Sequence, residues 1–405
     1  MKLGTPLLLA VLLALLASPV NIRTAAAQGS GNNGFAIRSP DGAYELAIGG
    51  LAQVDGRFFA DGIADDQFLV RRARLTFDVK AGERMSLRIR PESSNGDDVR
   101  VVDVYVDTRL PGSLTLRAGK FKPPVGLERL QSASDLRLIE RSFVTELVPS
   151  RDVGLQLSGE HETLSWAFGV FNGVPDGRTE DIGDDGEPEA AARLFFESFD
   201  RSSTGGAVFG FGLGATFGSR DGDASDPLLA AYRSPGQESI FSYRAGDDGT
   251  IAAGDRLRLS PQFYWFRGPL GLTGEWARVS QGASRPSGGR AATLEHDAWQ
   301  LTAEWFLTGE ASAYSDPDSR GALQLVARIS GLDLDNASFE GGTDSFADPL
   351  VSVTKAKSAA IGVNWFPLPG LKSSLVYQHT AFDGGAAAGD RPDERLLLVR
   401  LQQEF

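Results

Sequence analysis

Apolar and polar residues alternate with a period of two through most of the chain after residue 28. In the stretch 208–217, for example, Phe209, Phe211 and Leu213 fall on one parity and glycines fall on the other. Successive side chains of a β-strand point to opposite faces, so each alternating segment has one apolar and one polar face. No long segment carries the apolar stripe of an amphipathic helix. The alternation therefore predicts an all-β fold built from many strands.

An all-β chain with this pattern is either a soluble sandwich or β-helix, or a barrel that crosses a membrane. The tryptophans all fall on the apolar parity, mostly near the end of a segment, as in the aromatic girdles of membrane barrels. The polar parity carries Arg, Glu, Gln and Thr, which suits a lumen filled with water and charge. We therefore predict a transmembrane antiparallel β-barrel, with a soluble β fold as the alternative. The tryptophans are Trp166, Trp265, Trp276, Trp299, Trp305 and Trp365.

The connections between the alternating segments differ strongly in length. Tight connections such as 267–271 contrast with long, mostly acidic stretches at 175–189, 218–227 and 333–349. A barrel with short turns at one rim and long loops at the other has this rhythm. The mean hydropathy of −0.15 argues against a helical membrane protein.

The first residues predict export from the cytoplasm. Lys2 precedes an apolar run from Leu7 to Ala17, and Ala25, Ala26 and Ala27 offer a small-residue cleavage site. The apolar run is too short to cross a bilayer, so a signal peptide is favoured over a retained membrane anchor. The predicted division is a signal peptide at 1–27, a short N-terminal segment at 28–43 and the barrel at 44–405.

The chain ends on Phe405, which follows Leu397, Val399 and Leu401 on the same parity. A terminal phenylalanine that closes an alternating strand resembles the recognition signal of bacterial outer-membrane barrels. A closed barrel also satisfies every backbone hydrogen bond inside lipid. We therefore expect the protein in the outer membrane of a Gram-negative cell, in contact with outer-membrane lipid.

Composition excludes several classes of site. The chain has no cysteine, which removes disulfides, thiol catalysis and cysteine-ligated metals. Its three histidines, His161, His296 and His379, lie in no recognisable catalytic or metal-binding motif. The net charge of −13 argues against nucleic-acid binding. We expect neither an enzyme nor a cofactor.

The acidic total hides a basic block, because residues 68–151 hold 16 basic and 11 acidic residues. Parity directs Arg72 and Arg74 into the lumen and places Arg71 on the lipid side, unless a rim or a bulge turns it inward. The next segments send Arg88 and Asp103 inward. Inward arginines attract anions and bind phosphate-type oxyanions with forked geometry. Alternatively, these arginines only neutralise Asp103, Asp107 and other lumen carboxylates and solvate the wall.

The segment 118–151 shows no sustained alternation from Lys120 onward and contains three prolines. Such a segment inside a basic block is a candidate constriction loop that folds into the lumen. The alternative is an ordinary surface loop. Its basic residues that could join the wall arginines include Lys120, Lys122, Arg129 and Arg141.

One region of the chain resembles the phosphate-selective porin O/P family. The resemblance begins at AGKFKPPVGLERLQSASDLRLIER and continues at VPSRDVGLQLSGE, FGVFNGVPDG and KAKSAAIGVNWF. The order of these motifs extends it over nearly the whole chain after residue 35. It implies a 16-stranded outer-membrane barrel, usually a homotrimer, that passes small anions such as phosphate or polyphosphate.

The resemblance also assigns expected roles to single residues. Arg71, Arg72 and Arg74 look like part of an arginine ladder that leads anions to a constriction. Asp103 resembles a constriction carboxylate. Arg129, with Ser132 close by, and Arg141 resemble the basic residues of the inward loop. Ser132 and Ser134 here flank Ala133, whereas phosphate-specific members carry adjacent serines.

The sequence therefore predicts an anion-selective porin for phosphate or polyphosphate-like anions. A general unspecific porin is the main alternative, followed by a barrel enzyme and by a structural or adhesive barrel with a plugged lumen. The pore residues that we predict are Arg71, Arg72, Arg74, Arg88, Asp103, Lys120, Lys122, Arg129, Ser132 and Arg141.

The final residue yields a first test. Deleting Phe405 should lower the amount of protein that assembles in the outer membrane, because the insertion signal is lost. Membrane fractionation and the mobility of unboiled protein on a gel measure this directly. Equal assembly with and without Phe405 would contradict the prediction.

Overall fold

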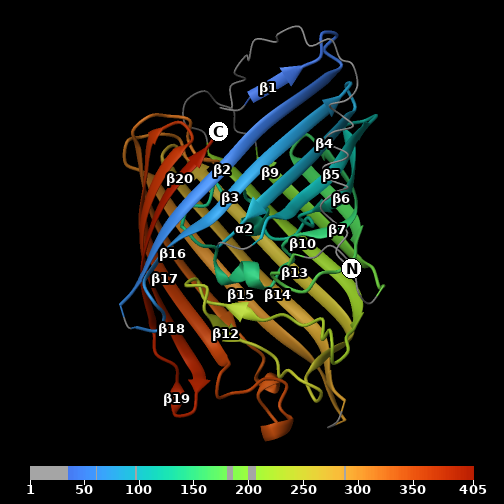
Figure 1. Cartoon of the computed structure of the whole chain (residues 1–405), viewed down its shortest axis with the longest axis vertical. Coiled ribbons are helices and arrows are strands. Elements are labelled where there is room, and N and C mark those ends of the chain that lie inside the picture. The colour runs from blue at the N-terminus through green and yellow to red at the C-terminus, as the bar shows by residue number, and fades with distance from the viewer. Residues whose placement is uncertain (1–34, 61, 96–97, 180–185, 199–206, 287–288) are drawn as a thin grey trace.

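The computed structural model describes residues 35–60, 62–95, 98–179, 186–198, 207–286 and 289–405 (Figure 1). The predicted signal peptide at 1–27 lies outside the described residues, as does the start of the N-terminal segment. No helix among the described residues is long and apolar enough to span a bilayer.

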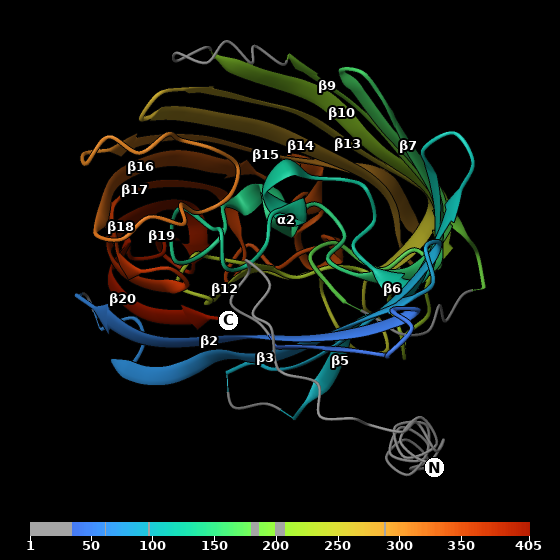
Figure 2. The same cartoon turned by 90° about the horizontal axis from the view of Figure 1, so that it is seen from above.

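Sixteen strands of the described chain form one closed antiparallel barrel, as predicted (Figures 1 and 2). Each strand pairs with the next along the chain, and β2 pairs with β20 to close the ring. Closure leaves no open edge in the wall. The barrel strands are β2(Tyr44–Phe59), β3(Gln67–Ala81), β4(Met85–Ser93), β5(Arg100–Leu110), β6(Leu114–Phe121), β7(Asp152–His161), β8(Leu164–Phe171), β9(Glu189–Ser198), β10(Val208–Asp221), β13(Ile251–Arg267), β14(Leu270–Arg285), β15(Arg290–Phe306), β16(Ala322–Asp333), β17(Val353–Leu368), β18(Leu371–Ala386) and β20(Glu394–Glu404).

The alternation of the sequence becomes the two faces of the wall. In β20, Leu397, Val399 and Leu401 are exposed on the outside, while Arg400 and Gln402 between them are buried inside. Trp299, Trp305 and Trp365 are likewise exposed on the outer face. Apolar side chains therefore cover the wall toward lipid, and polar side chains fill the interior.

The two rims differ as the sequence predicts. Connections of two or three residues join β3 to β4, β5 to β6, β7 to β8, β13 to β14 and β17 to β18. These connections, together with the C-terminus, lie at the short-turn rim, at the top of Figure 1. The opposite, long-loop rim carries 222–250 and 334–352, with the short elements β11(Tyr232–Arg233), β12(Ser239–Phe241), η2(Asn336–Ser338) and η3(Gly342–Asp344). Two further short strands are β1(Phe35–Arg38), which pairs with β2, and β19(Gly389–Asp390), which pairs with β18.

The constriction loop, residues 122–151, leaves the wall after β6 and folds into the lumen. It contains α2(Leu127–Leu130) and η1(Phe143–Glu146), and Figure 2 shows α2 inside the ring of strands. The strand β6 continues to Phe121, so the loop begins a few residues later than the predicted 118.

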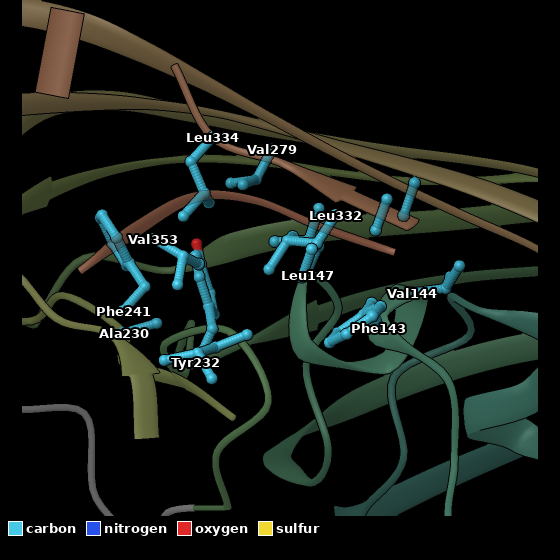
Figure 3. Close-up of a cluster of buried hydrophobic side chains, with 14 of the residues drawn as sticks. Phe143, Val144, Leu147, Ala230, Tyr232, Phe241, Val279, Leu332, Leu334 and Val353 are labelled. Atoms are coloured by element: carbon cyan, nitrogen blue, oxygen red, sulfur yellow. The ribbon is translucent and has the colours of Figure 1, made fainter. Parts of the chain in front are cut away.

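An apolar cluster holds the constriction loop against one side of the barrel (Figure 3). Phe143, Val144 and Leu147 of the loop are buried against wall residues such as Val279 and Leu332. A second cluster packs Leu138 and Ile139 against β16 to β20. Because these contacts fill the lumen on the side of β14 to β20, open space remains mainly beside the opposite wall.

A second segment enters the lumen from the opposite rim. The connection 307–321 between β15 and β16 starts at the short-turn rim and reaches the constriction loop, which the sequence did not predict. The amide Nε2 of Gln131 donates to the carbonyl oxygen of Tyr314 at 2.9 Å. Asp316 of this connection forms an ion pair with Arg137 at 3.0 Å and a second ion pair with Lys372 of β18 at 2.9 Å.

Candidate functional site

A cavity of about 910 Å³ lies between the constriction loop and the wall made by β3, β4, β5 and β6. We call it the outer cavity, because residues near the long-loop rim such as Asp98 and Arg100 also line it. Twelve of its lining residues are Arg or Lys, and three are Asp or Glu. This interior is therefore strongly basic although the whole chain is acidic.

A β-bulge turns two consecutive arginines into this lumen. Gln53 of β2 is opposite Arg72, and Val54 is opposite Val70, so Arg71 is the extra residue of β3. Both Arg71 and Arg72 are buried inside the barrel. An arginine that faced lipid at mid-depth would cost about 2–4 kcal/mol. The bulge avoids this cost and gives the lumen one more cation.

Most wall arginines are held by a carboxylate on the neighbouring strand. Arg88 forms a two-bonded pair with Asp78, at 2.6 and 2.9 Å, and Arg74 donates to Glu92 at 2.6 Å. Asp103 lies between two guanidinium groups and accepts from Arg90 at 3.0 Å and from Arg151 at 2.9 Å. These pairs fix the side chains in place and cancel much of their charge.

Three cations of the constriction loop differ from Arg137 and Arg151, because they donate hydrogen bonds to backbone carbonyl oxygens rather than to carboxylates. Lys122 donates to Leu130 O at 3.2 Å and to Gln131 O at 2.9 Å. Arg141 donates to Glu128 O at 3.2 Å and to Gln131 O at 2.9 Å. In the described part of the chain, neither cation forms an ion pair with a carboxylate. Their positive charge is therefore not cancelled locally.

Arg129 belongs to the same group. It donates to the carbonyl oxygen of Thr145 and, at 3.4 Å, to Ser150 Oγ, and no described carboxylate pairs with it. Burial, and then the nearby Arg141, Arg151 and Arg129, lower the pKa of Lys122 well below its usual value. This direction is expected for a cation surrounded by other cations. We name Lys122, Arg129 and Arg141 the loop cation cluster.

Glu140 ties the constriction loop to the arginine wall. Its carboxylate accepts from Arg71 at 2.7 Å and from Arg57 at 3.1 Å, and Arg400 lies 3.6 Å away. Burial alone raises the pKa of Glu140, but Arg71 and Arg400 outweigh burial and hold this pKa below its usual value. Arg400 is itself held by Asp55 at 2.6 Å. One loop carboxylate thus organises three wall arginines.

A second cavity, of about 950 Å³, lies toward the short-turn rim. We call it the inner cavity, since Phe405 and the turn at Gly370 line it. The two cavities are adjacent along the wall, because both are lined by Arg74, Arg88, Arg90 and Ser132.

All ten sequence-predicted pore residues line the outer cavity, where the structure brings them together. Their roles remain predictions. Arg72 donates to Gln53 Oε1 at 2.8 Å, and Ser132 Oγ lies 2.9 Å from Ser134 Oγ. Lys120 is buried on β6. The ten are Arg71, Arg72, Arg74, Arg88, Asp103, Lys120, Lys122, Arg129, Ser132 and Arg141.

Sequence reasoning missed Glu140 and Arg100 as parts of this site. Arg100 is the first residue of β5, where the alternation is only beginning, and Glu140 acts through contacts with residues far away in the chain. No group of three or more metal-ligating side chains occurs among the residues that the structure describes.

Comparison with protein families gives one match. The family profile described as phosphate-selective porin O and P matches residues 50–405. No curated protein matches the chain.

Solved structures of low sequence identity share the fold. The outer-membrane channel DcaP of Acinetobacter baumannii is 11% identical, with a TM-score of 0.56 over 91% of this chain and 99% of that one. The anion-selective porin from Comamonas acidovorans is 11% identical, with a TM-score of 0.56 over 89% and 100%. OmpT of Vibrio cholerae is 10% identical, with a TM-score of 0.56 over 94% and 100%. At these identities the similarity concerns the fold alone.

Glu140 provides a test of how the site is held. Replacing Glu140 with Ala leaves Arg57 and Arg71 without their shared carboxylate inside the barrel. Breaking a buried ion pair on one side costs about 3–5 kcal/mol, so the free energy of unfolding should fall by that order. A urea titration that follows the fraction of protein with folded gel mobility measures this change.

The matched control is Glu83→Ala. Glu83 is exposed in the turn between β3 and β4, and its removal should change the free energy of unfolding by less than about 0.5 kcal/mol. Equal urea midpoints for the two variants would mean that Glu140 does not organise the site.

Proposed function

The chain belongs to the family of phosphate-selective porins O and P, and we propose that it forms a water-filled channel selective for phosphate-type anions. The path runs through the outer and inner cavities along β3 and β4. Within the fold of an outer-membrane porin, the open space beside this wall is the route left by the packed constriction loop.

One observation carries the proposal of anion selectivity. The loop cation cluster, Lys122, Arg129 and Arg141, lies at the outer cavity with its donors on carbonyl oxygens and without carboxylate partners. Rings of Arg or Lys make a pore selective for anions. An anion about 4 Å from one such cation gains on the order of 1–4 kcal/mol, depending on the effective dielectric constant. Several such contacts keep each one weak enough for release.

The bonding of the cluster also explains why phosphate-type anions suit it. A guanidinium has five donors, and the contacts to Gln131 and Glu128 occupy only part of those of Arg141. The remaining donors can bind oxyanions with forked geometry. Ser132 Oγ, which lines the same cavity, adds a hydroxyl donor.

A general unspecific porin is the second candidate, and the ion pairs of the wall favour it. Two ion pairs of the wall present nearly neutral surfaces to the lumen: Arg88 pairs with Asp78, and Arg74 pairs with Glu92. The two candidates therefore differ in whether the loop cation cluster dominates permeation. A barrel enzyme is the less favoured alternative, because no hydrogen bond joins a serine to a histidine among the described residues, and His379 pairs with Asp393 instead.

We also propose a homotrimer surrounded by outer-membrane lipid, as the family resemblance implies. One similar solved structure, 9% identical with a TM-score of 0.56, is described as the trimer form of OmpT of Vibrio cholerae. A cross-linking experiment on the detergent-extracted protein determines the number of subunits.

Removing the cluster tests the channel. In a planar bilayer with a potassium chloride gradient, the wild-type reversal potential should show a preference for chloride, and phosphate should block the chloride current. In Arg129→Ala/Arg141→Ala, the reversal potential should move toward zero, and the concentration of phosphate needed for half block should rise roughly tenfold or more.

Arg267→Ala serves as the control, because Arg267 is an exposed residue at the short-turn end of β13 and lines neither cavity. Its reversal potential and phosphate block should equal those of the wild type. A wild-type pore that prefers potassium over chloride at moderate salt would refute the proposed selectivity.

The lowered pKa of Lys122 gives a pH test. Burial and the nearby Arg141 disfavour the charged ammonium, so Lys122 loses its proton at a lower pH than an ordinary lysine. The chloride preference should therefore fall as pH rises, and the fall should occur well below the usual lysine pKa of about 10. In Lys122→Arg, which keeps its charge in this range, the fall should be smaller. Identical pH profiles would exclude Lys122 as the titrating group.

A further inference from the structure

The two cavities along the proposed path differ strongly in their balance of basic and acidic residues. Leaving aside the arginines that both share, the outer cavity has nine cationic and three acidic lining residues. Besides the three shared arginines, Arg74, Arg88 and Arg90, the inner cavity has two cationic residues, Lys80 and Lys372, and six acidic ones. These six are Glu45, Asp78, Asp135, Asp316, Asp318 and Glu404.

Ion pairs reduce both charges without removing the contrast. In the inner cavity, Asp316 is paired with Arg137 and Lys372, Asp78 with Arg88, and Glu45 with Lys80 and Arg38. Asp135, Asp318 and Glu404 form no ion pair among the described residues. Three acidic groups therefore stay uncancelled at the inner end.

In the outer cavity the uncancelled groups are mostly cations, and the exposed Asp98 is the acidic exception. Arg72 and Arg100 form no ion pair within the described chain, and the loop cation cluster, Lys122, Arg129 and Arg141, likewise lacks a carboxylate partner. Uncancelled cations near the long-loop rim are thus followed along the path by uncancelled acids near the short-turn rim.

The connection 307–321 holds part of this acidic group in the lumen. Its Tyr314 donates through the hydroxyl to the carbonyl oxygen of Leu127, and Asp316 is fixed by Arg137 and Lys372. Asp318 follows two residues later and is exposed to the inner cavity. Asp135 lies beside this connection, since its Oδ1 accepts from the Asp316 N–H at 3.3 Å.

We propose that this arrangement makes the pore a rectifier, which passes anions more easily from the long-loop rim to the short-turn rim than in reverse. Anions are the mobile ions of the outer cavity, and cations are those of the inner cavity. A voltage that drives anions from the outer to the inner cavity also drives cations from the inner to the outer cavity. Both kinds of ion then accumulate where the two cavities adjoin, and the conductance rises. The opposite voltage draws both kinds of ion away from the region where the two cavities adjoin, and the current falls.

The direction has a consequence for uptake. In membrane barrels the short turns face the periplasm and the long loops face the outside. The favoured polarity is thus the one that drives anions inward. Asp135 and Asp318 are then determinants of direction, whereas the loop cation cluster determines the sign of the permeating ion.

This inference rests on the proposed anion channel, and the experiment separates the two. Because the chain has no cysteine, the variant Leu350→Cys carries a single thiol, in the exposed loop after β16 at the long-loop rim, and this thiol is biotinylated. Streptavidin is then added to one chamber of the bilayer. Its binding shows whether the long-loop rim faces that chamber. Current–voltage curves are then recorded with symmetrical potassium chloride. At about 0.1 M salt, we expect roughly 1.5- to 3-fold more current when anions move from the long-loop rim.

Salt and substitution identify the cause. At about 1 M salt the Debye length falls to about 3 Å, and the current ratio should approach one. In Asp135→Asn/Asp318→Asn at low salt, the ratio should also approach one, while the chloride preference remains or increases. Asp383→Asn, an exposed position on the outside of β18, is the control and should keep the wild-type ratio.

The outcomes separate cleanly. Symmetrical wild-type curves at low salt, or a ratio unchanged in the double variant, would overturn the rectifier, even if the pore prefers chloride. Preference for potassium would instead overturn the proposed anion channel. A larger current when anions move from the short-turn rim would overturn the proposal that the acidic residues of the inner cavity set the direction of rectification.

Discussion

The charge inside this barrel follows from one physical constraint: side chains that contact the hydrocarbon core of a membrane must be apolar. Because the outer face of every strand must be apolar, the polar half of each strand, with most of its charge, goes inward. The bulge at Arg71 shows how strong this constraint is, since the strand register changes rather than leave a guanidinium in lipid. The lumen therefore receives many ions in a small volume, and their pairing decides what remains for a solute.

Pairing divides these ions into two groups. Ions on neighbouring strands, such as Arg88 and Asp78, lie directly opposite each other and cancel. The constriction loop is placed by apolar packing of residues such as Leu147 and Phe143, and this packing leaves Lys122, Arg129 and Arg141 without a carboxylate partner among the described residues. Backbone carbonyl oxygens can orient these cations but do not neutralise them. Surplus charge is thus a product of the way in which the loop is held.

The sequence predicts the part of this structure that depends on local pattern. Alternation identifies the strands and their faces, including the inward Arg72 and Arg74, because a lipid-facing wall permits only one parity. It does not identify the role of Glu140, which bonds to Arg71 across 69 residues. It also does not reveal that the connection 307–321 enters the lumen, since its polar residues read as an ordinary turn. Such features depend on tertiary position rather than on periodicity.

The meeting of two inward segments has a mechanical consequence. The constriction loop comes from one rim, the connection 307–321 comes from the other, and Gln131, Arg137, Tyr314 and Asp316 join them. A loop anchored at one rim could swing aside for a bulky solute, but this one would have to break contacts with a partner fixed to the opposite rim. The constriction loop is therefore braced from both rims of the barrel, which restricts its movement within the lumen.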